Sequence, residues 1–433
     1  MKTTNKLLFE LQDGVYDSCI EAVTGPGSDS RMRESLEAAL HGFEGDFGQM
    51  EVSVYGAPFA VPLLGEFTEP QNGAVLSAAI DSELILVTCE SEDKMVHLYS
   101  EAKGLIELDP WGLKRNENEV RSEKGLVRGI LSELKQRGYE IGGFNAYILG
   151  RAPFDIDEIY VPTLEVLLTR AIYELFNSGE LSKYELAEIG QGASNSHYDI
   201  PSGIARQLAA EMGGISFADF KRPGIPISSK VAGEALPRDY RIVLTQLYPK
   251  AILNERTDID ALGDVARELR QAAGVIGTGV LRDVPNDVVI EHSAAIRDKL
   301  GDRALLRSFC YMGEVVRTLE AGSYIITDDV DKFLNTFKLA GNSRFKYLQS
   351  YGVANAPTFE DLAIALAVSD ELLYDGGASA IMGDGTKGIS IAIAGSGRVD
   401  DYVKSMQLIF GSGSEDEISD VCCFSSCGLF RLV

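Results

Sequence analysis

The spacing of apolar residues along the chain predicts a mixture of helices and strands. Within residues 163–176, apolar side chains recur at intervals of three and four, which is typical of one buried face of a helix. Residues 51–60 instead alternate with a period of two, which is typical of a strand. The same patterns predict helices over 29–44, 122–137, 181–189, 201–212, 259–273, 288–300, 303–321, 331–340 and 358–373, and strands over 84–88, 143–149, 241–244, 388–394 and 422–433.

Prolines and glycines cluster between residues 222 and 238, which indicates a seam between two parts of the chain. A chain of 433 residues is too long for one ordinary hydrophobic core, so two domains are expected. Since strands and helices are mixed throughout, the predicted fold class is α+β. We expect an N-terminal domain over 1–222, with a helical extension over 1–50, and a C-terminal domain over 223–433.

The net charge of the chain excludes some classes of binding partner. It carries 65 acidic and 40 basic residues, which gives a formal net charge of −25. A surface this negative repels nucleic acids and anionic membranes, so neither is an expected partner. No apolar run approaches the ~20 residues of a membrane span, and the N-terminus has no apolar core of signal-peptide length. These features and the sparse cysteines predict a cytoplasmic protein.

Three cysteines, Cys422, Cys423 and Cys427, are grouped near the C-terminus. A zinc site built on them would need a fourth ligand, and no histidine lies nearby in the sequence. The group is therefore predicted to be a set of small residues in a terminal β-hairpin, and no metal is expected.

Several segments resemble the galactokinase branch of the GHMP kinases. Residues 57–73 read APFAVPLLGEFTEPQNG, similar to the first family motif, APGRVNLIGEHTDYNGG. Further likenesses lie at 129–150, 163–176, 190–220, 342–350 (NSRFKYLQS, similar to SSFxYLQN) and 376–402. The resemblance implies a two-domain fold, with a ribosomal S5 domain 2-like N-terminal domain and a ferredoxin-like C-terminal domain. It also implies ATP-dependent phosphorylation of a sugar as the family activity.

The phosphate-binding loop of that family, GLGLSSSAA, aligns with residues 154–162, which read FDIDEIYVP. Asp155, Asp157 and Glu158 stand where the resemblance places the phosphates. A carboxylate ~5 Å from a phosphate charge costs about 3 kcal/mol at an effective dielectric constant of ~20. The three acids could instead bind a divalent cation such as Mg²⁺ or Ca²⁺, or form an acidic N-cap to a helix that begins near Pro162.

The catalytic aspartate of the family lies in a GIMDQ segment, which aligns here with Gly203-Ile-Ala-Arg-Gln207. Arg206 occupies the aspartate position, and a guanidinium cannot act as a base near neutral pH. Arg206 could bind an anion or form a structural bridge to Glu66 or Glu69. The arginine that works with the catalytic aspartate is replaced by Ala60.

The first family motif also supplies the glutamate, histidine and aspartate that contact the sugar. The corresponding residues here are Glu66, Phe67 and Glu69. The two acids could still hold sugar hydroxyls, although the imidazole contact is lost. Alternatively, they are loop acids without a ligand.

The third family motif, which closes over the phosphates, aligns with residues 382–388, MGDGTKG. Gly383 and Gly385 keep the character of a turn, and Lys387 could contact an anion. Asp384 adds a negative charge at the same place. The alternative is a plain turn that leads into a strand.

Taken with the family pattern, these changes predict a galactokinase-like protein that has lost phosphotransfer and binds a sugar-like ligand or a partner. No cofactor is expected under this hypothesis. One alternative is an active sugar kinase that uses ATP and Mg²⁺ in a rearranged site. Another is a structural or interaction protein whose cleft is filled by its own side chains. The oligomeric state is left open.

Overall fold

The computed structural model describes residues 1–24, 29–101, 103–199, 203–222, 224, 226–231, 233–247, 261–349, 360–383, 388–411, 418–425 and 427–433. The chain forms two compact units. Unit 1 comprises Met1–Val61, Ala78–Gly214 and Ser425–Val433, and unit 2 comprises Pro62–Ser77 and Ile215–Phe424. The two units are interleaved along the chain, whereas the predicted division into 1–222 and 223–433 is sequential.

Unit 1 is built around a mixed sheet with the strand order β1-β2-β3-β6-β4-β5, in which β13 also pairs with β2. Its strands are β1 (Lys2–Thr3), β2 (Glu51–Leu64), β3 (Ala74–Glu90), β4 (Val96–Ser100), β5 (Gly104–Leu108), β6 (Phe144–Leu149) and β13 (Phe430–Arg431). Its helices are α1 (Thr4–Gln12), α2 (Asp17–Thr24), α3 (Asp29–Phe47), α4 (Glu123–Gln136), α5 (Asp157–Phe176), α6 (Lys183–Ala193) and α7 (Ala205–Met212). Strands β2 and β3 are long and both continue into unit 2.

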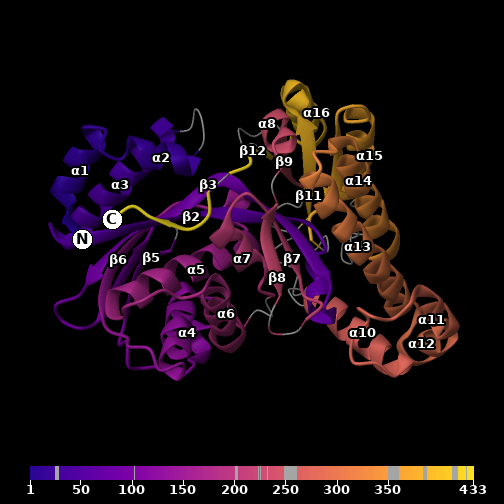
Figure 1. Ribbon diagram of the computed structural model, residues 1–433, viewed down its shortest axis with the longest axis horizontal. Helices are drawn as coiled ribbons and strands as arrows, with labels where there is room; N and C mark the ends of the chain where they lie inside the picture. Colours follow the sequence, from indigo (N-terminus) through magenta and orange to yellow (C-terminus); the bar gives the residue numbers. More distant parts are fainter. Residues whose placement is uncertain are drawn as a thin grey trace. The chain divides into compact units, whose positions relative to one another are not determined.

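The two faces of the unit 1 sheet are covered by different helices (Figure 1). Val52 and Val54 of β2 belong to a buried cluster with Leu36 and Leu40 of α3. Because successive side chains of a strand point to opposite faces, Tyr55 faces the other side. Its hydroxyl donates a hydrogen bond to Glu174 of α5 at 3.0 Å. The N-terminal helices therefore cover one face, and α5 covers the other.

Unit 2 contains a four-stranded antiparallel sheet with the order β10-β11-β9-β12. It also contains β7 and β8, which pair with each other and belong to the nine-stranded sheet because β7 pairs with β3. Its strands are β7 (Ile215–Asp219), β8 (Ile227–Val231), β9 (Tyr240–Gln246), β10 (Gly377–Ile381), β11 (Ile389–Gly395) and β12 (Ser419–Cys422). Its helices are α8 (Ala235–Asp239), α10 (Ala261–Ile276), α11 (Asn286–Glu291), α12 (Ser293–Leu300), α13 (Asp302–Ile326), α14 (Val330–Tyr347), α15 (Asp361–Leu372) and α16 (Val399–Phe410).

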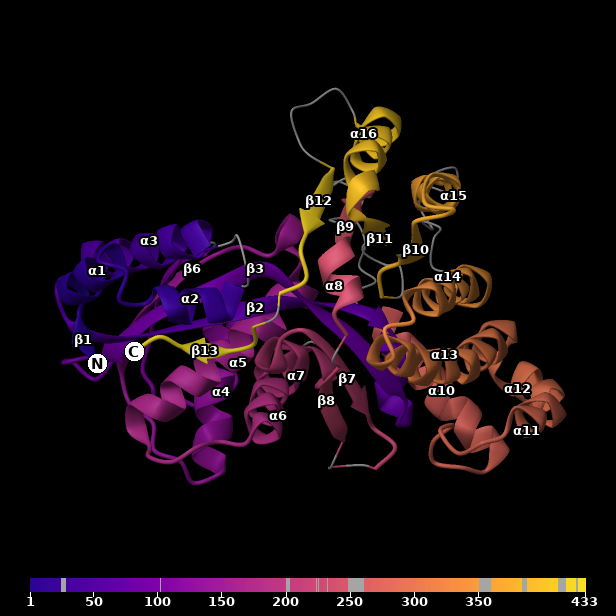
Figure 2. The ribbon, with the colours of Figure 1, turned by 45° about the horizontal axis from the view of Figure 1, so that its top comes forward.

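The core of the four-stranded sheet lies against α15 and α16 (Figure 2). Val243 of β9 and Ala392 of β11 are in one buried cluster with Leu362 of α15 and with Tyr402 and Met406 of α16. None of the helices in the described segments combines the length and the apolar character needed to cross a membrane.

The predicted terminal β-hairpin is wrong. Strand β12 pairs with β9, and β13 pairs with β2, so the two terminal strands belong to different sheets. Between them, the backbone N–H of Ser425 donates to the carbonyl of Ala79, and that of Leu429 donates to the carbonyl of Glu211. Because backbone donors must find partners, these contacts hold the segment along unit 1 and leave none for a hairpin.

A buried ion pair joins the two long helices α13 and α14 of unit 2. Glu314 is fully buried, and Arg344 is 3% exposed. The Nη2 and Nε atoms of Arg344 lie 2.6 and 3.1 Å from Oε1 of Glu314. Arg344 also donates to the carbonyls of Leu63 and Ile381, both at 2.9 Å, and Oε1 of Glu314 accepts the N–H of Gly65 at 3.0 Å. The pair thus ties the end of β2, both helices and the end of β10 together.

The charges around Glu314 keep it ionised inside the protein. Burial by itself raises the pKa of this carboxyl, but Arg344 and Arg317 outweigh that effect and hold the pKa below its ordinary value. Gly65 is needed beside the pair because its φ is +78°, and any side chain there would collide with the carbonyl of Ala74.

We expect Arg344→Met to lower the free energy of unfolding by about 3–5 kcal/mol, because it leaves the Glu314 carboxylate buried without its main counter-charge. The double variant Arg344→Met, Glu314→Leu removes that charge as well and should recover part of the loss. Urea titration followed by circular dichroism measures both effects. A double variant no more stable than the single one would contradict the role given to the pair.

Candidate functional site

The segment aligned with the phosphate loop forms a short turn and the first turn of a helix. The turn spans Pro153–Asp155, and α5 then begins at Asp157, so the predicted helix start near Pro162 is wrong. Asp157 and Glu158 lie in the first helical turn, where carboxylates complement the positive end of the helix dipole. Phe154 has a φ of 55°, a left-handed conformation that glycine adopts more easily. The N-terminus of α5 therefore carries its own acids.

Arg206 supplies a hydrogen bond that Pro162 removes from α5. In an α-helix the carbonyl of residue 158 accepts the N–H of residue 162, but Pro162 has no N–H. The Nη1 atom of Arg206, on α7, donates to this same carbonyl of Glu158. The guanidinium of Arg206, at the position predicted for the family's base, thus satisfies a partly buried backbone acceptor. Any predicted bridge from Arg206 to Glu66 or Glu69 would join the two units and stays a prediction.

Glu165 lies one turn beyond Pro162 and is fully buried. Its carboxylate accepts hydrogen bonds from the Ser194 hydroxyl and from Nε2 of Gln207, the latter at 2.7 Å. Burial raises the pKa of Glu165 to about 8, and the two hydrogen bonds and the charge of Arg206 only partly offset this rise. The carboxyl therefore holds its proton near neutral pH inside the folded protein.

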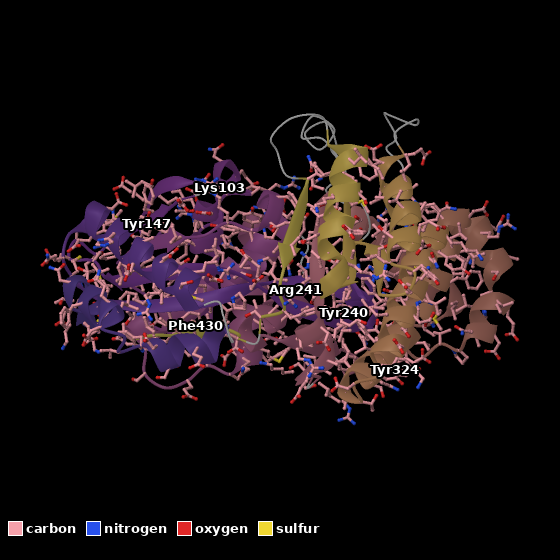
Figure 3. The ribbon with its side chains drawn as sticks, turned by 90° about the horizontal axis from the view of Figure 1, so that it is seen from above. Lys103, Tyr147, Tyr240, Arg241, Tyr324 and Phe430 are labelled. Carbon is pink, nitrogen blue, oxygen red and sulfur yellow. The ribbon has the colours of Figure 1, made fainter. Side chains whose placement is uncertain are left out.

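A pocket of about 220 Å³ lies at the N-terminal ends of α4 and α5 in unit 1. Its apolar wall is formed by buried residues of β5, α4 and α5, namely Ile106, Leu126, Val161 and Leu164. The polar lining includes Lys103, Arg121, Ser122, Glu123, Lys124, Asp157, Tyr160 and Tyr198. Lys103 lies at the surface of the unit (Figure 3). The pocket therefore opens beside the altered phosphate-loop segment.

Glu123 is the pocket residue that sequence reasoning missed. It is 6% exposed, and its Oε1 accepts hydrogen bonds from Ser100 at 3.1 Å and Tyr160 at 2.7 Å. Burial raises the pKa of this carboxyl. From the sequence, Glu123 is only an acid in the first turn of the predicted helix 122–137, where acids are common on the surface. Nothing in the pattern signals that tertiary packing encloses it.

The sugar-site candidates lie in unit 2, in the short 3-10 helix Glu66–Gln71. Phe67 is buried in a hydrophobic cluster with Leu269 of α10 and Tyr311 of α13, so its side chain contributes to packing. A Cβ atom added to Gly383 would lie 2.8 Å from Oε2 of Glu66. The segments aligned with the first and third motifs are therefore neighbours within this unit.

The structure describes the remaining predicted site positions only in part. Ala60 is buried in β2 of unit 1. Gly385 and Lys387 lie outside the described residues, as does the side chain of Asp155. The predicted convergence of the altered positions on one cleft would bring together residues of both units, and it stays a prediction.

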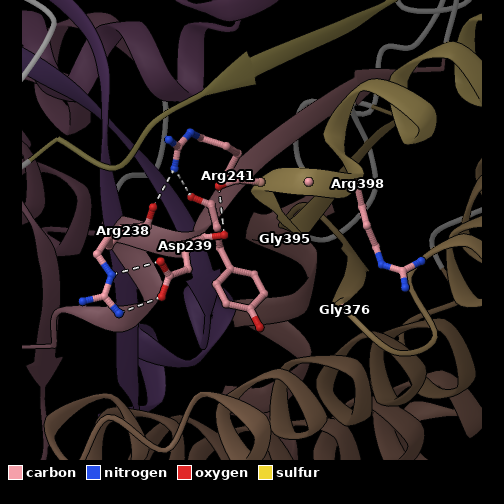
Figure 4. A pocket seen from close by; sticks show the side chains of 9 residues that line it. Arg238, Asp239, Arg241, Gly376, Gly395 and Arg398 are labelled. Atoms are coloured by element: carbon pink, nitrogen blue, oxygen red, sulfur yellow. Dashed lines mark hydrogen bonds and ion pairs between the residues drawn. The ribbon is translucent and has the colours of Figure 1, made fainter.

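A second pocket, of about 490 Å³, lies at one end of the four-stranded sheet of unit 2 (Figure 4). Arg238 is paired with Asp239 at 2.9 Å, and Arg398 is paired with Asp375. Arg241 donates to the carbonyls of Arg238 and Tyr240. Since none of these charged side chains is buried, this pocket is a weaker candidate than the one in unit 1.

Comparison with known sequences identifies galactokinases as relatives. The chain is 29% identical over 280 residues to a galactokinase of Lactococcus lactis subsp. lactis, covering 63% of this chain and 67% of the relative. It is 24% identical over 299 residues to a galactokinase of Limosilactobacillus fermentum, covering 67% and 74%. No protein-family model matches the chain.

Comparison with solved structures shows the fold of the chain. Lactococcus lactis galactokinase complexed with galactose superposes with a TM-score of 0.76 and 23% identity, covering 91% of this chain and 99% of that one. The Methanococcus jannaschii mevalonate kinase gives a TM-score of 0.58 at 13% identity, covering 86% and 98%. The α+β fold class with the two-domain architecture of GHMP kinases is confirmed.

A double-mutant cycle tests the bond from Arg206 to the Glu158 carbonyl. Arg206→Met should lower the free energy of unfolding by about 1–3 kcal/mol, because a buried acceptor loses its donor. In a Pro162→Ala background the helix supplies its own N–H, so the same change at Arg206 should cost less. Chemical denaturation of the four proteins gives the coupling energy. Equal costs in both backgrounds would show that Arg206 does not replace the missing helical bond.

The raised pKa of Glu165 predicts a pH-dependent stability. The folded pKa of about 8 lies above the ordinary value of 4.5. The contribution of Glu165 to the free energy of unfolding is therefore fully present below pH 4.5 and is lost as the pH rises towards 8. The loss amounts to about 1.4 kcal/mol per pH unit within that window. Glu165→Gln should lack this slope, with the Gln207 amide turned to accept. The melting temperature of Glu165→Gln relative to that of the unchanged protein should therefore rise from pH 5 through pH 6.5 to pH 8. A difference that stays constant would refute the raised pKa of Glu165.

Proposed function

The chain is a homologue of galactokinases and has the fold of the GHMP kinase superfamily, and from this we propose that it has lost phosphotransfer and binds a small sugar-like ligand or a partner. The observation that carries the proposal is the contact of Arg206 with the Glu158 carbonyl. The residue at the base position is a permanent cation that is used to complete a helix, so it cannot accept a proton from a sugar hydroxyl.

The electrostatics at the start of α5 support the same proposal. Kinases of this superfamily need donors at this helix N-terminus for the charge of ATP, with Mg²⁺. Here Asp157 and Glu158 already occupy the first turn, and the turn before it contains Pro153 and Phe154 rather than a run of glycines. Two changes in different segments thus act against the same step, one on the base and one on the phosphates.

The sugar-like ligand is the part of the proposal that rests on relatives. One structurally similar galactokinase was solved in complex with galactose. In this chain the aligned acids Glu66 and Glu69 are retained in unit 2, and carboxylates commonly accept hydrogen bonds from hydroxyl groups. Binding without turnover requires only these acceptors and does not require the base.

Turnover of galactose with labelled ATP and Mg²⁺ tests the negative half of the proposal. We expect no phosphorylated sugar above background, because neither a base nor a phosphate cradle is present at the aligned positions. An active galactokinase in the same assay is the control. Turnover within the usual kinase range of ~1–100 s⁻¹ would refute the loss of activity and favour the rearranged kinase.

Thermal-shift titration tests the positive half. A ligand present at 100 times its Kd adds about 2.7 kcal/mol of stability. We expect galactose or a related sugar to raise the melting temperature and ATP with Mg²⁺ to leave it unchanged. A shift with ATP would count against the proposal, whereas protection by neither ligand would favour a protein partner.

A further inference from the structure

The mouth of the unit 1 pocket carries two positively charged side chains that form no salt bridge in the described part of the chain. Lys103 and Arg121 line the pocket, both are exposed, and neither forms an ion pair with a described residue. Lys124, the third basic residue of the lining, pairs with Glu119 at 3.7 Å. In a protein with a net charge of −25, two cations that line one pocket without a salt bridge favour a negatively charged group at this mouth.

The backbone holds Arg121 in place. Its φ is 58°, a left-handed conformation that is uncommon for a residue with a long side chain. Its N–H donates to the carbonyl of Tyr198 at 3.1 Å, so the turn is fixed against the far side of the pocket. Arg121 also directly precedes Ser122, the N-cap of α4. The backbone of Arg121 is therefore fixed beside a helix N-terminus, where the helix dipole also attracts anions.

The inner part of the pocket carries the opposite charge. The Oε2 atom of Glu123 is sealed from solvent and has no hydrogen-bond partner among the described residues, although Oε1 accepts from Ser100 and Tyr160. An unpartnered charged oxygen in the interior is costly. Burial raises the pKa of this carboxyl, and Asp157 raises it further, although Lys103 acts in the opposite direction. A positively charged nitrogen of a ligand would supply the missing partner when the carboxylate of Glu123, which lines the pocket, turns to meet it.

The remaining lining sets the size and character of the ligand. Ile106, Leu126, Val161 and Leu164 form a buried apolar wall, and the pocket holds about 220 Å³. Since an apolar cavity of ~150 Å³ accommodates benzene, a ligand of about nine heavy atoms fits here. A sugar would place hydroxyl groups against this wall, and a triphosphate would exceed the volume.

We propose that the unit 1 pocket binds a free α-amino acid with an apolar side chain. The ammonium group faces Glu123, the carboxylate faces Arg121 and Lys103, and the side chain lies against the apolar wall. This inference goes beyond the proposed function, because it requires neither a sugar nor the absence of kinase activity.

Isothermal titration of the full-length protein with L-leucine and L-phenylalanine tests the proposal. At least one of the two should bind, and N-acetyl-L-leucine and L-leucinamide, which each lack one of the two charges, should bind at least about tenfold more weakly than leucine. Binding of neither amino acid would overturn the proposal, as would equal binding of the N-acetylated form. ATP is the third probe, and binding of ATP to this pocket in competition with leucine would also overturn it.

Three variants locate the site. Glu123→Gln keeps the shape and the acceptor for Ser100 and Tyr160, and should weaken leucine binding at least about tenfold. Arg121→Asn removes the outer charge while asparagine tolerates the left-handed backbone, and should also weaken binding. Lys94→Asn is the matched control, because Lys94 is another cation with a positive φ of 64° and does not line the pocket.

Circular dichroism of each variant checks that the fold is kept. Unchanged leucine affinity in folded Glu123→Gln would overturn the proposal, as would a loss in Lys94→Asn equal to that in Arg121→Asn. The kinase assay is a separate readout. Turnover would refute the proposed loss of phosphotransfer without affecting amino-acid binding, and failure of leucine and phenylalanine to bind would leave that loss untouched.

Discussion

The Glu314 carboxylate and the Arg344 guanidinium set the arrangement of unit 2, because two charges removed from water need nearly all of their hydrogen-bonding groups satisfied. Besides each other, the two charges bind groups of two further segments: the N–H of Gly65 and the carbonyl of Leu63 near the end of β2, and the carbonyl of Ile381 in β10. This fixes the end of β2 against α13 and α14. The short helix that carries Glu66, Phe67 and Glu69 follows directly, so its place is set by an interaction in which none of these three residues takes part.

Unit 1 also depends on one polar group, the backbone carbonyl of Glu158, which its own helix leaves without a donor. Pro162 removes one donor from α5, and Arg206 of α7 provides the replacement. The next residue, Gln207, binds Glu165 of the same helix. Two successive side chains of α7 thus hold α5 by its polar groups. At the position where a kinase of this superfamily has a base, this chain uses the side chain to keep a helix intact.

Much of the fold could be predicted from the sequence where the pattern is long and regular. The helix over 163–176 and the strand over 51–60 were both found by period, and both are present within α5 and β2. The five-residue strands β4, β5 and β10 were missed. The terminal hairpin was wrong because strand pattern alone does not state which strand a segment pairs with.

The sequence by itself determined which residue types stand where the resemblance places the family motifs, and it predicts an arginine for the base, acids for the glycine loop and a phenylalanine for the histidine. It could do so because those positions are recognised by order and spacing along the chain. Only the tertiary structure decided what these residues do. It joined Arg206 to the carbonyl left open by Pro162, and it enclosed Glu123 beside a pocket whose cations lie at its mouth. The physical reason is that burial and hydrogen-bond partners are set by contacts between distant segments, and a local pattern does not contain them.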